Sequence, residues 1–390
     1  MINKEEESLS LLRRYCESID FQGWDPFDGL NSKVFNSIAL FHNSDLIRLA
    51  WIQFFKRCPI NLRQLFKINK DYNPKGLGLF LSGYCNLWKI DPKEEYLLII
   101  RQLAFLIIEL KSKGWSGACW GYNFDWQARA FFQPAKTPTV VASSFIGNAL
   151  FDAYDILREK EILDVAVSIG AFVIKDLNRT YDSKGNFSFS YSPLDKTTVY
   201  NASLLGARIL SRIYSYTKDE VCITLAKQNV QFCIDKQNSD GSWFYSPLKY
   251  HQWIDNFHTG FNLECISQYM TFASDFSFVF EMNHGMQFYK QNFFTETGIP
   301  KYYHNKLYPI DLHSTAQFIL TCSKMGIFNE NIELINSVIK WTITNMQSKQ
   351  GYFYFQKNQF YINKIPYIRW TQAWMFLALT EYLKNSKPIH

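Results

Sequence analysis

A glycine followed by an aromatic-rich stretch recurs five times along the chain. The glycines are Gly121, Gly185, Gly241, Gly298 and Gly351, so successive repeats begin 64, 56, 57 and 53 residues apart. A polar cluster follows each glycine after about 15–20 residues and opens a segment whose apolar residues have helical spacing. A regular repeat of this length predicts a fold built from one supersecondary unit used several times.

That unit is a pair of helices. The first four helical segments are each followed, after a short turn, by a second segment with apolar residues at three- and four-residue steps, as in amphipathic helices that cover a core. Residues 76–112 supply one more pair, and residues 32–55 supply a twelfth helix. Twelve alternating helices predict an all-α fold, an (α/α)6 toroid of six inner and six outer helices. The alternative is an open helical solenoid, whose repeats are usually shorter and lack long aromatic loops.

The predicted toroid is one domain over residues 1–390, with residues 1–31 as an N-terminal extension packed on it. The turns from inner to outer helices are short, whereas the connections from outer to inner helices are long and carry the glycine–aromatic stretches. All the long loops are therefore expected at one end of the ring, beside the first turns of the inner helices. Binding residues concentrate on long loops held by a rigid scaffold, so this mouth is the expected functional site.

Polar side chains gather just before or within the first turn of the inner helices. We expect the candidate acids and bases to be His258, His313, Tyr303, Asp255 and Asp125. The two histidines fall at equivalent positions in their repeats, which suggests that they face each other across the axis. Each residue also has a structural interpretation, because an Asp before a helix is usually a cap and a lone histidine is often a hydrogen-bonded structural residue.

Positive charge and flat aromatic surfaces define the expected ligand. Six helix N-termini converging on one mouth create a positive potential, which Arg129, Lys301 and Arg369 reinforce. Tryptophan rings offer apolar surfaces for a sugar ring. The expected substrate-binding residues are Trp126, Arg129, Asn201, Trp253, Asn256, Lys301, Asp311, Arg369 and Trp370. Together they predict an anionic saccharide or a lipid-linked glycan as partner.

Composition excludes several other classes. The net charge of +6 is scattered, without a block of Lys or Arg, which argues against nucleic-acid binding. The start MINKEEESLS lacks the apolar run of a signal peptide, and no stretch has the 18 or so uncharged apolar residues of a membrane span. The eight cysteines show no paired spacing, which predicts free thiols in a reducing cytoplasm and no metal site. No cofactor is expected, and the sequence does not indicate an oligomeric state.

The glycine–aromatic loops before inner helices resemble the six-hairpin toroids of carbohydrate enzymes, which include glucuronyl epimerases, uronate lyases, acylglucosamine epimerases and inverting glycosidases. The combination of GWDPFDGLNS, DGSWFYSP with WIDNFHTG, and PKYYHNKLYPIDLHS also resembles toroids associated with bacterial surface-polysaccharide synthesis. Terpene cyclases fit less well because the chain has no D-x-D-D motif, and the zinc-dependent toroids fit less well because it has no D-x-C motif.

Three functions remain open. The leading expectation is proton abstraction at a carbon of an acidic sugar, as in uronate epimerisation or elimination, with His258 and His313 as base and acid and Tyr303 as a competing acid. Arg129, Asn201 and Arg369 would then bind the carboxylate. The second is inverting glycoside hydrolysis by paired carboxylates, Asp125 with Asp255 or Asp311. The third is a noncatalytic glycan-binding or assembly subunit.

Overall fold

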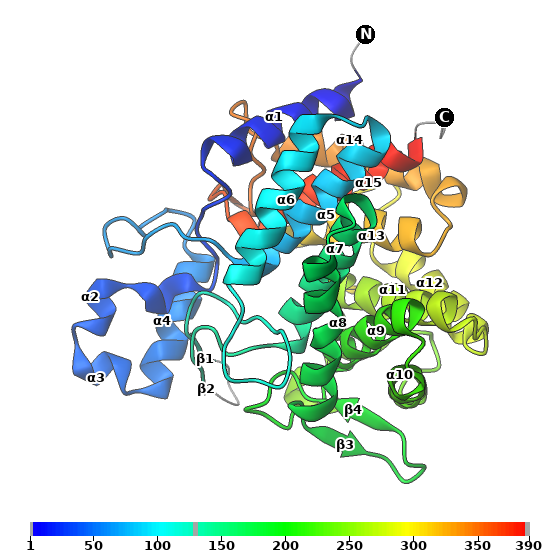
Figure 1. Cartoon of the computed structure of the whole chain (residues 1–390). Coiled ribbons are helices and arrows are strands. Elements are labelled where there is room, and N and C mark those ends of the chain that lie inside the picture. Colours follow the sequence, from blue (N-terminus) through cyan, green and yellow to red (C-terminus); the bar gives the residue numbers. More distant parts are fainter. Residues whose placement is uncertain (1–2, 128–131, 387–390) are drawn as a thin grey trace.

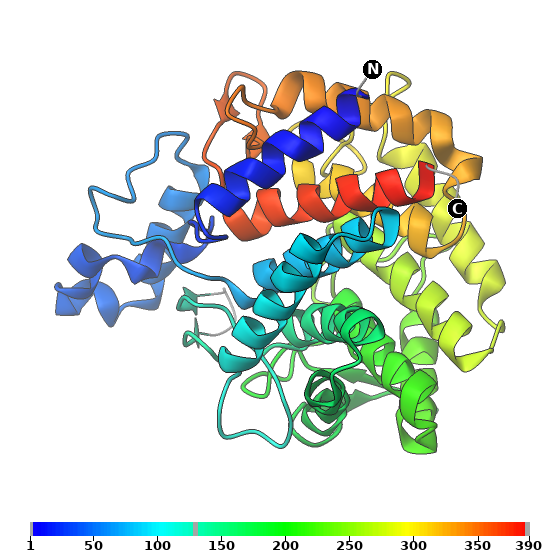
Figure 2. The same ribbon diagram turned by 45° about the horizontal axis from the view of Figure 1, so that its top comes forward.

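Six helices form the inner ring. The structure is a computed structural model, and it describes residues 3–127 and 132–386. The inner helices are α5 (Pro74–Ile90), α7 (Val140–Leu157), α9 (Tyr200–Thr217), α11 (Asn256–Ala273), α13 (Leu312–Lys324) and α15 (Ala373–Ser386). Each packs against the next, and α15 packs against α5 (Figure 2), so the ring is closed. A π-helical turn, η4 (Ile368–Gln372), leads directly into α15.

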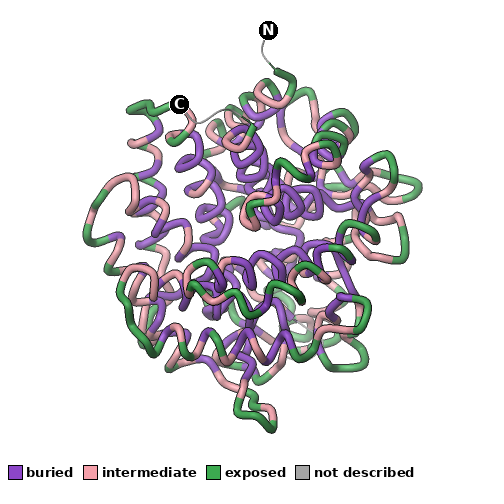
Figure 3. Tube along the Cα trace, turned by 90° about the vertical axis from the view of Figure 1, so that its right-hand side faces the viewer, coloured by how far each residue is buried: buried purple, intermediate pink, exposed green. Residues whose placement is uncertain are grey.

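Six outer helices surround this ring (Figure 1). They are α6 (Glu94–Glu109), α8 (Lys160–Lys175), α10 (Glu220–Ile234), α12 (Val279–Asn292), α14 (Ile332–Met346) and α1 (Lys4–Ser18). The tube coloured by burial shows the buried residues concentrated on the inner helices and the exposed ones on the periphery (Figure 3). The predicted all-α toroid of six inner and six outer helices is confirmed.

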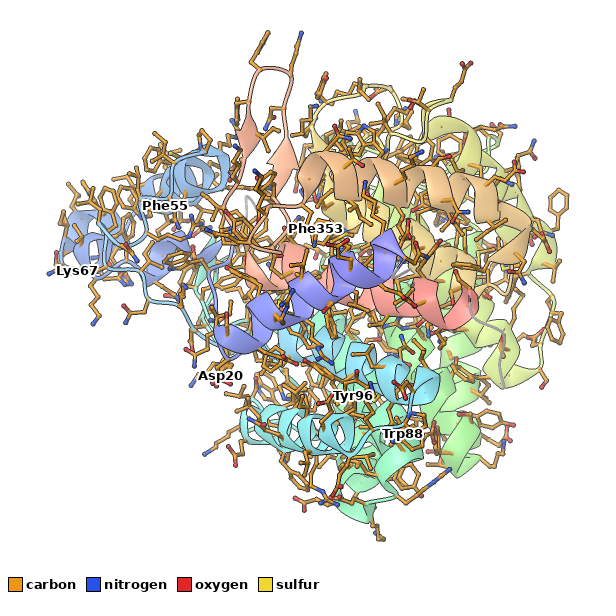
Figure 4. All side chains as sticks on the ribbon, turned by 90° about the horizontal axis from the view of Figure 1, so that it is seen from above. Asp20, Phe55, Lys67, Trp88, Tyr96 and Phe353 are labelled. Carbon is orange, nitrogen blue, oxygen red and sulfur yellow. The ribbon has the colours of Figure 1, made fainter. Side chains whose placement is uncertain are left out.

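The twelfth ring position is filled by a different segment from the one expected. Residues 32–57 form three helices, α2 (Lys33–Asn36), α3 (Ala39–His42) and α4 (Asp45–Arg57), and the hydroxyls of Ser32 and Ser44 cap the starts of α2 and α4. These helices lie beside the ring (Figure 1), and Figure 4 shows Phe55 and Lys67 in this lobe, away from Tyr96 on α6. Instead, α1 packs on α14 and α15 and buries Leu9 and Leu12.

Close contact between inner helices depends on small residues. A Cβ atom added at Gly83 on α5 would lie 2.5 Å from Cδ1 of Phe376 on α15, and one added at Gly147 on α7 would lie 2.6 Å from Ile209 on α9. A larger residue at either position would force the facing side chains of the neighbouring helix to move. Of the described helices, α7 alone is long and apolar enough to cross a membrane, but it is an inner helix with most of its residues buried in the protein.

Short antiparallel strands occur only in the connecting segments of the described chain. A hairpin joins β1 (Trp126–Gln127) to β2 (Phe132–Gln133), and a second joins β3 (Arg179–Tyr181) to β4 (Phe187–Phe189). A three-stranded sheet pairs β5 (Ile310–Asp311), β6 (Gln356–Lys357) and β7 (Ile362–Asn363) in that order. Single 3-10 turns complete the connections, namely η1 (Asp28–Asn31), η2 (Lys249–His251) and η3 (Asn329–Asn331). All eight cysteines are free thiols, as predicted.

Candidate functional site

A repeated backbone hydrogen bond holds the long loops over the inner helices. The first amide of α7 donates to the carbonyl of Tyr191, that of α9 to Tyr245, and that of α11 to Tyr302. The first amides of a helix have no partner inside the helix, so a loop carbonyl supplies one. Each loop is thereby fixed over the start of the preceding inner helix, and the aromatic-rich loops lie at one end of the ring, as predicted.

Aromatic rings from these loops form the rim of the mouth. The hydroxyl oxygens of Tyr122 and Tyr191 are 3.2 Å apart, and the Trp126 ring lies 6.0 Å from the Tyr191 ring. Trp253 stacks on Tyr245 with ring centroids 4.7 Å apart and an angle of 16°. Burial raises the pKa of Tyr191 well above its ordinary value and raises that of Tyr245 as well, so both phenols stay protonated at neutral pH.

Asp255 and His258 form a hydrogen-bonded pair at the start of α11. Oδ2 of Asp255 lies 2.7 Å from Nδ1 of His258, and Oδ1 accepts the backbone N–H of His258 at 3.0 Å as a helix cap. The indole of Trp253 also donates to Oδ2 at 3.0 Å. Asp255 is fully buried, whereas the His258 side chain is 23% exposed. Asp255 therefore acts both as a cap, as its structural interpretation required, and as the partner that orients the histidine.

A narrow cleft between α9 and α11, too tight for a water molecule in this structure, is lined in part by the His258 ring. Its lining includes Asn201, Trp253, Asp255, His258 and Asn262. Nδ2 of Asn201 and Oδ1 of Asn262 are buried without a hydrogen-bond partner in the described chain. Buried polar atoms are almost always paired in native proteins. One unused donor and one unused acceptor beside a histidine are the features expected of a site that receives a polar ligand.

His313 is in a different environment from His258. Its ring is buried between Phe257, at 4.3 Å and nearly parallel, and Trp374, at 4.2 Å. Neither ring nitrogen has a hydrogen-bond partner in the part of the chain that the structure describes. Burial, followed by the charge of Lys75, lowers the pKa of His313 well below its ordinary value, so this imidazole is neutral.

The expectation that the two histidines face each other across the axis is wrong. The capping residues Asp255 and Asp311 are equivalent, but His258 follows its cap by three residues and His313 by two. One residue turns a side chain by about 100° around a helix. The histidines lie on neighbouring inner helices, and the ring of Phe257 contacts both, at 4.2 Å from His258 and 4.3 Å from His313.

Arg369 is committed to a structural ion pair. Its Nε and Nη2 donate to the two carboxylate oxygens of Asp25 at 2.6 and 2.8 Å, and both side chains are buried. Its guanidinium also lies 4.8 Å from the centroid of the Tyr122 ring. A substrate carboxylate could bind Arg369 in its predicted role only by competing with the Asp25 carboxylate, which already pairs with it.

Asp311 is a buried carboxyl in the same mouth. It accepts hydrogen bonds from the Trp370 indole at 3.1 Å, from the Gln356 amide at 3.1 Å and from the His313 backbone at 3.0 Å. Burial raises its pKa to about 6 despite these donors. Trp370 is thus turned toward Asp311, and its ring edge lies against His313 at 5.2 Å.

The other predicted residues are more dispersed. Lys301 donates to the carbonyl of His304 at 2.8 Å, and Tyr303 pairs through its backbone with Asp255. Asn256 is fully buried, and its side-chain oxygen accepts the Tyr289 hydroxyl, which favours a structural role. Asp125 accepts the backbone N–H of Ala135 at 2.7 Å. Arg129 lies outside the described residues.

Sequence reasoning missed Lys75, the second residue of α5, whose side chain is buried at the ring axis. Its Nζ lies 4.4 Å from the centroid of Phe145 and 5.2 Å from that of Trp374. The sequence could have indicated Lys75 by its position, because the predicted site residues Asn201, His313 and Arg369 are also the second residues of their helical segments.

Beneath these aromatic rings the axis becomes polar again. Arg208 pairs with Glu264 at 2.6 Å, and Arg212 pairs with Asp152 at 3.2 Å, around a cavity of about 50 Å³. A water molecule needs about 10–15 Å³ of such space, so the cavity has room for a few waters. Among residues 3–127 and 132–386, no group of three or more His, Cys, Asp or Glu side chains is placed to hold a metal ion.

Comparison with solved structures shows the fold. The chain is similar to the cellobiose 2-epimerase from Bacillus thermoamylovorans, with a TM-score of 0.61, 11% identity and coverage of 81% of this chain and 90% of that one. It is also similar to the GH76 alpha-mannanase BT2949 of Bacteroides thetaiotaomicron (TM-score 0.60, 13% identity, 81% and 88% covered) and to an unsaturated glucuronyl hydrolase specific for heparin (TM-score 0.62, 10% identity, 98% and 96% covered).

A comparison with protein-family models finds no match, and a search of curated protein sequences finds none either. At identities near one in ten, the likeness to the three solved structures is one of architecture. The chain has the (α/α)6 toroid fold that these saccharide-active proteins share.

Proposed function

We propose that the protein is a carbohydrate-active enzyme that moves a proton at a carbon of an acidic sugar, as a uronate epimerase or lyase does. The observation that carries this proposal is the 2.7 Å hydrogen bond between Asp255 and Nδ1 of His258 in a polar cleft. The names of the similar solved structures support a saccharide as the ligand class. Fold alone does not determine the reaction, so the argument for proton transfer rests on the site.

The Asp255–His258 pair has the arrangement of a general base. A buried carboxylate on Nδ1 fixes the tautomer that leaves Nε2 able to accept a proton, and it stabilises the imidazolium that then forms. No residue in the described chain hydrogen-bonds Nε2 of His258, and the ring keeps an exposed edge. Asn201 and Asn262 offer their unused donor and acceptor to sugar hydroxyls beside this base.

Two neutral groups are candidates for the opposing acid. Burial and the Asp255 carboxylate raise the pKa of Tyr303, so its phenol holds a proton at neutral pH. His313 is also neutral and has two unused ring nitrogens, so it can donate a hydrogen bond to developing negative charge without carrying a charge itself. Both stay candidates, because Tyr303 is held next to Asp255 only through its backbone, whereas the rings on either side of His313 restrict its access to a substrate carbon.

Incubation with acidic oligosaccharides in deuterated water, followed by NMR and mass spectrometry, tests the proposal. Deuterium incorporation without cleavage indicates epimerisation, and an unsaturated product indicates elimination. His258→Gln should reduce turnover by about 10²–10⁴-fold, because glutamine keeps a hydrogen bond but cannot exchange a proton. His284→Gln, on outer helix α12, is the matched control and should retain activity. Folded His258→Gln with normal turnover would remove His258 from the mechanism.

Glycoside hydrolysis is the second candidate, favoured by one observation. The pKa of Asp311 is raised to about 6 by burial, as in a carboxyl that serves as a general acid. Against this, Asp255 accepts three hydrogen bonds, which limits its use as the paired base. Clean hydrolysis without deuterium exchange, abolished by Asp311→Asn or Asp125→Asn but retained in His258→Gln, would replace the first proposal by this one.

A noncatalytic glycan-binding or assembly subunit is the third possibility, and it would tolerate loss of both histidines while still binding saccharide. The lipid-linked form of the substrate, a role in surface-polysaccharide synthesis and a cytoplasmic location are further proposals drawn from the sequence. Saccharide binding with no turnover in wild-type protein, unchanged by His258→Gln, would favour the subunit.

A further inference from the structure

A lysine is buried at the axis of the ring without a counter-ion. Lys75 is 3% exposed, and its Nζ lies against three aromatic faces, those of Phe145, Trp374 and Phe261, at 4.4, 5.2 and 5.7 Å from their centroids. In residues 3–127 and 132–386, no carboxylate lies within ion-pair distance of this nitrogen, and no hydrogen-bond acceptor contacts it. Such a group is rare in a folded protein, because lysines are almost never fully buried unless paired.

The surrounding charges do not balance. Two other cations act on Lys75, Arg369 and Arg208. Arg369 is paired with Asp25, with atoms 2.6 Å apart, and Arg208 is paired with Glu264, also at 2.6 Å. Three cations therefore face two carboxylates, and the lysine is the unpaired one.

The aromatic faces compensate only part of this imbalance. Contact with aromatic rings stabilises a desolvated cation, but by less than the loss of hydration destabilises it. Burial, reinforced by Arg369 and Arg208, accordingly lowers the pKa of Lys75 well below its ordinary value. An anion bound beside Lys75 would therefore stabilise the ammonium form of this side chain.

Other polar groups at the same level of the ring also lack partners. Lys75, Asn201 and His313 are each the second residue of an inner helix, so they lie at one depth around the axis. Nδ2 of Asn201 and both ring nitrogens of His313 are buried and unpaired in the described chain. These are donors and acceptors of the kind that a carboxylated sugar can satisfy.

We propose that Lys75 pairs with the carboxylate of the bound ligand, which places a sugar acid with its carboxylate toward the ring axis. This assignment rests on the proposed function for the sugar part of the ligand, and it replaces Arg369 as the carboxylate-binding cation. Arg369 with Asp25 on one side, Arg208 on α9 and the neutral His313 on α13 are the titratable and charged groups that face Lys75.

Binding is then coupled to protonation. Burial lowers the pKa of Lys75 in the free protein, and a bound carboxylate should raise it again, so binding draws protons from solvent to the amine and yields an ammonium–carboxylate pair with no other bond made or broken. Titration calorimetry at about pH 8 in two buffers of different ionisation enthalpy measures this uptake. The probes are glucuronate and its neutral counterpart glucose.

The wild-type protein should bind glucuronate at least about tenfold more tightly than glucose, an energy typical of one charge-assisted contact, and take up as much as one proton. Lys75→Met should lose both the preference and the uptake. Lys75→Arg keeps a permanent charge, so it should keep the preference without the uptake. Equal binding of both sugars by the wild type, absence of glucuronate binding, or an unchanged preference in folded Lys75→Met would each overturn the assignment.

A measurement without ligand gives an independent test. Lys75→Met removes a buried cation with no partner, so it should raise the Tm of the free protein. Lys384→Met removes a lysine that pairs with Glu381 at 2.5 Å and should lower it. A lower Tm for both variants would show that Lys75 is a structural residue and would overturn the proposal. These results do not depend on turnover, so the two proposals can fail separately. The proposed function fails if no deuterium is exchanged, even if Lys75 still selects anions. The Lys75 proposal fails if Lys75→Met binds glucuronate normally, even if the wild-type protein exchanges deuterium.

Discussion

The ion pair between Asp25 and Arg369 joins the two ends of the chain, and Asp25→Asn tests how strongly it closes the ring. The two residues are 344 positions apart, they share two hydrogen bonds of 2.6 and 2.8 Å, and both side chains are about 4% exposed. Removing one partner of a buried pair leaves the other charge without compensation, which typically destabilises a protein by about 3–5 kcal/mol. Asparagine can still accept one hydrogen bond, for example the one that Oδ1 receives from the Phe27 backbone.

The expected loss for Asp25→Asn is therefore near the lower limit, about 3 kcal/mol, a large part of the roughly 5–15 kcal/mol by which proteins are usually stable. Urea unfolding followed by tryptophan fluorescence measures it as a lower midpoint at similar slope. Asp164→Asn is the control, because Asp164 pairs with Lys160 on the exposed face of α8 and should change stability by less than about 0.5 kcal/mol.

A double variant separates the interaction energy of the ion pair from the other effects of each substitution. In Asp25→Asn with Arg369→Met, no charge is left unpaired, so the double variant should be more stable than the sum of the two single losses predicts. The reasoning is refuted if Asp25→Asn matches Asp164→Asn within error, because the ring would then close without help from this pair.

Three further predictions concern the helix interface, the cap and the buried carboxyl. Gly83→Ala should destabilise the protein by about 1–3 kcal/mol, seen as a lower Tm, because its Cβ would lie 2.5 Å from the Phe376 ring; an unchanged Tm would mean that α5 and α15 are packed less closely. Asp255→Asn should destabilise the protein by about 1–3 kcal/mol, because the amide oxygen can keep the helix cap but the amide NH2 then faces the Trp253 indole N–H. It should also reduce turnover by about 10²–10⁴-fold, because an amide favours the wrong tautomer of His258; retained turnover in kinetic assays would assign Asp255 to capping alone. The pKa of Asp311 is about 6 in the folded protein and about 3.9 in the unfolded chain, so the contribution of this carboxyl to stability is present below about pH 4 and is lost as the pH rises through about 6. Urea unfolding should therefore show that Asp311→Asn gains about 2–3 kcal/mol of stability relative to the wild type between about pH 4 and pH 7. A stability difference that stays constant over this pH range would contradict the raised pKa.

The sequence by itself determined the repeat, the helical pairs and the end of the ring where the long loops and the candidate site lie. Each of these depends on local information. Helical spacing of apolar residues specifies an amphipathic helix, and the alternation of short and long connections places every long loop on one side. The pairing of His258 with Asp255 was also within reach, because three residues along one helix start bring the two side chains together.

Contacts between distant segments were decided by the tertiary structure. The twelfth helix is α1 and not residues 32–55, because that stretch breaks into α2, α3 and α4 beside the ring, whereas α1 packs on α14 and α15. A one-residue offset after the cap sends His313 into an aromatic sandwich and leaves His258 at the cleft. No periodic signal in the sequence marks such an offset.

Charge pairing is the clearest case. The sequence shows Asp25, Lys75 and Arg369 as three ordinary charged residues far apart in the chain, and it predicts Arg369, with Arg129 and Lys301, as ligand-binding cations. Only the closed ring brings Asp25 to Arg369 and leaves Lys75 without a partner. The strength of an ion pair depends on the distance between the charges and on how far they are buried from water, and neither can be read from the amino-acid sequence alone.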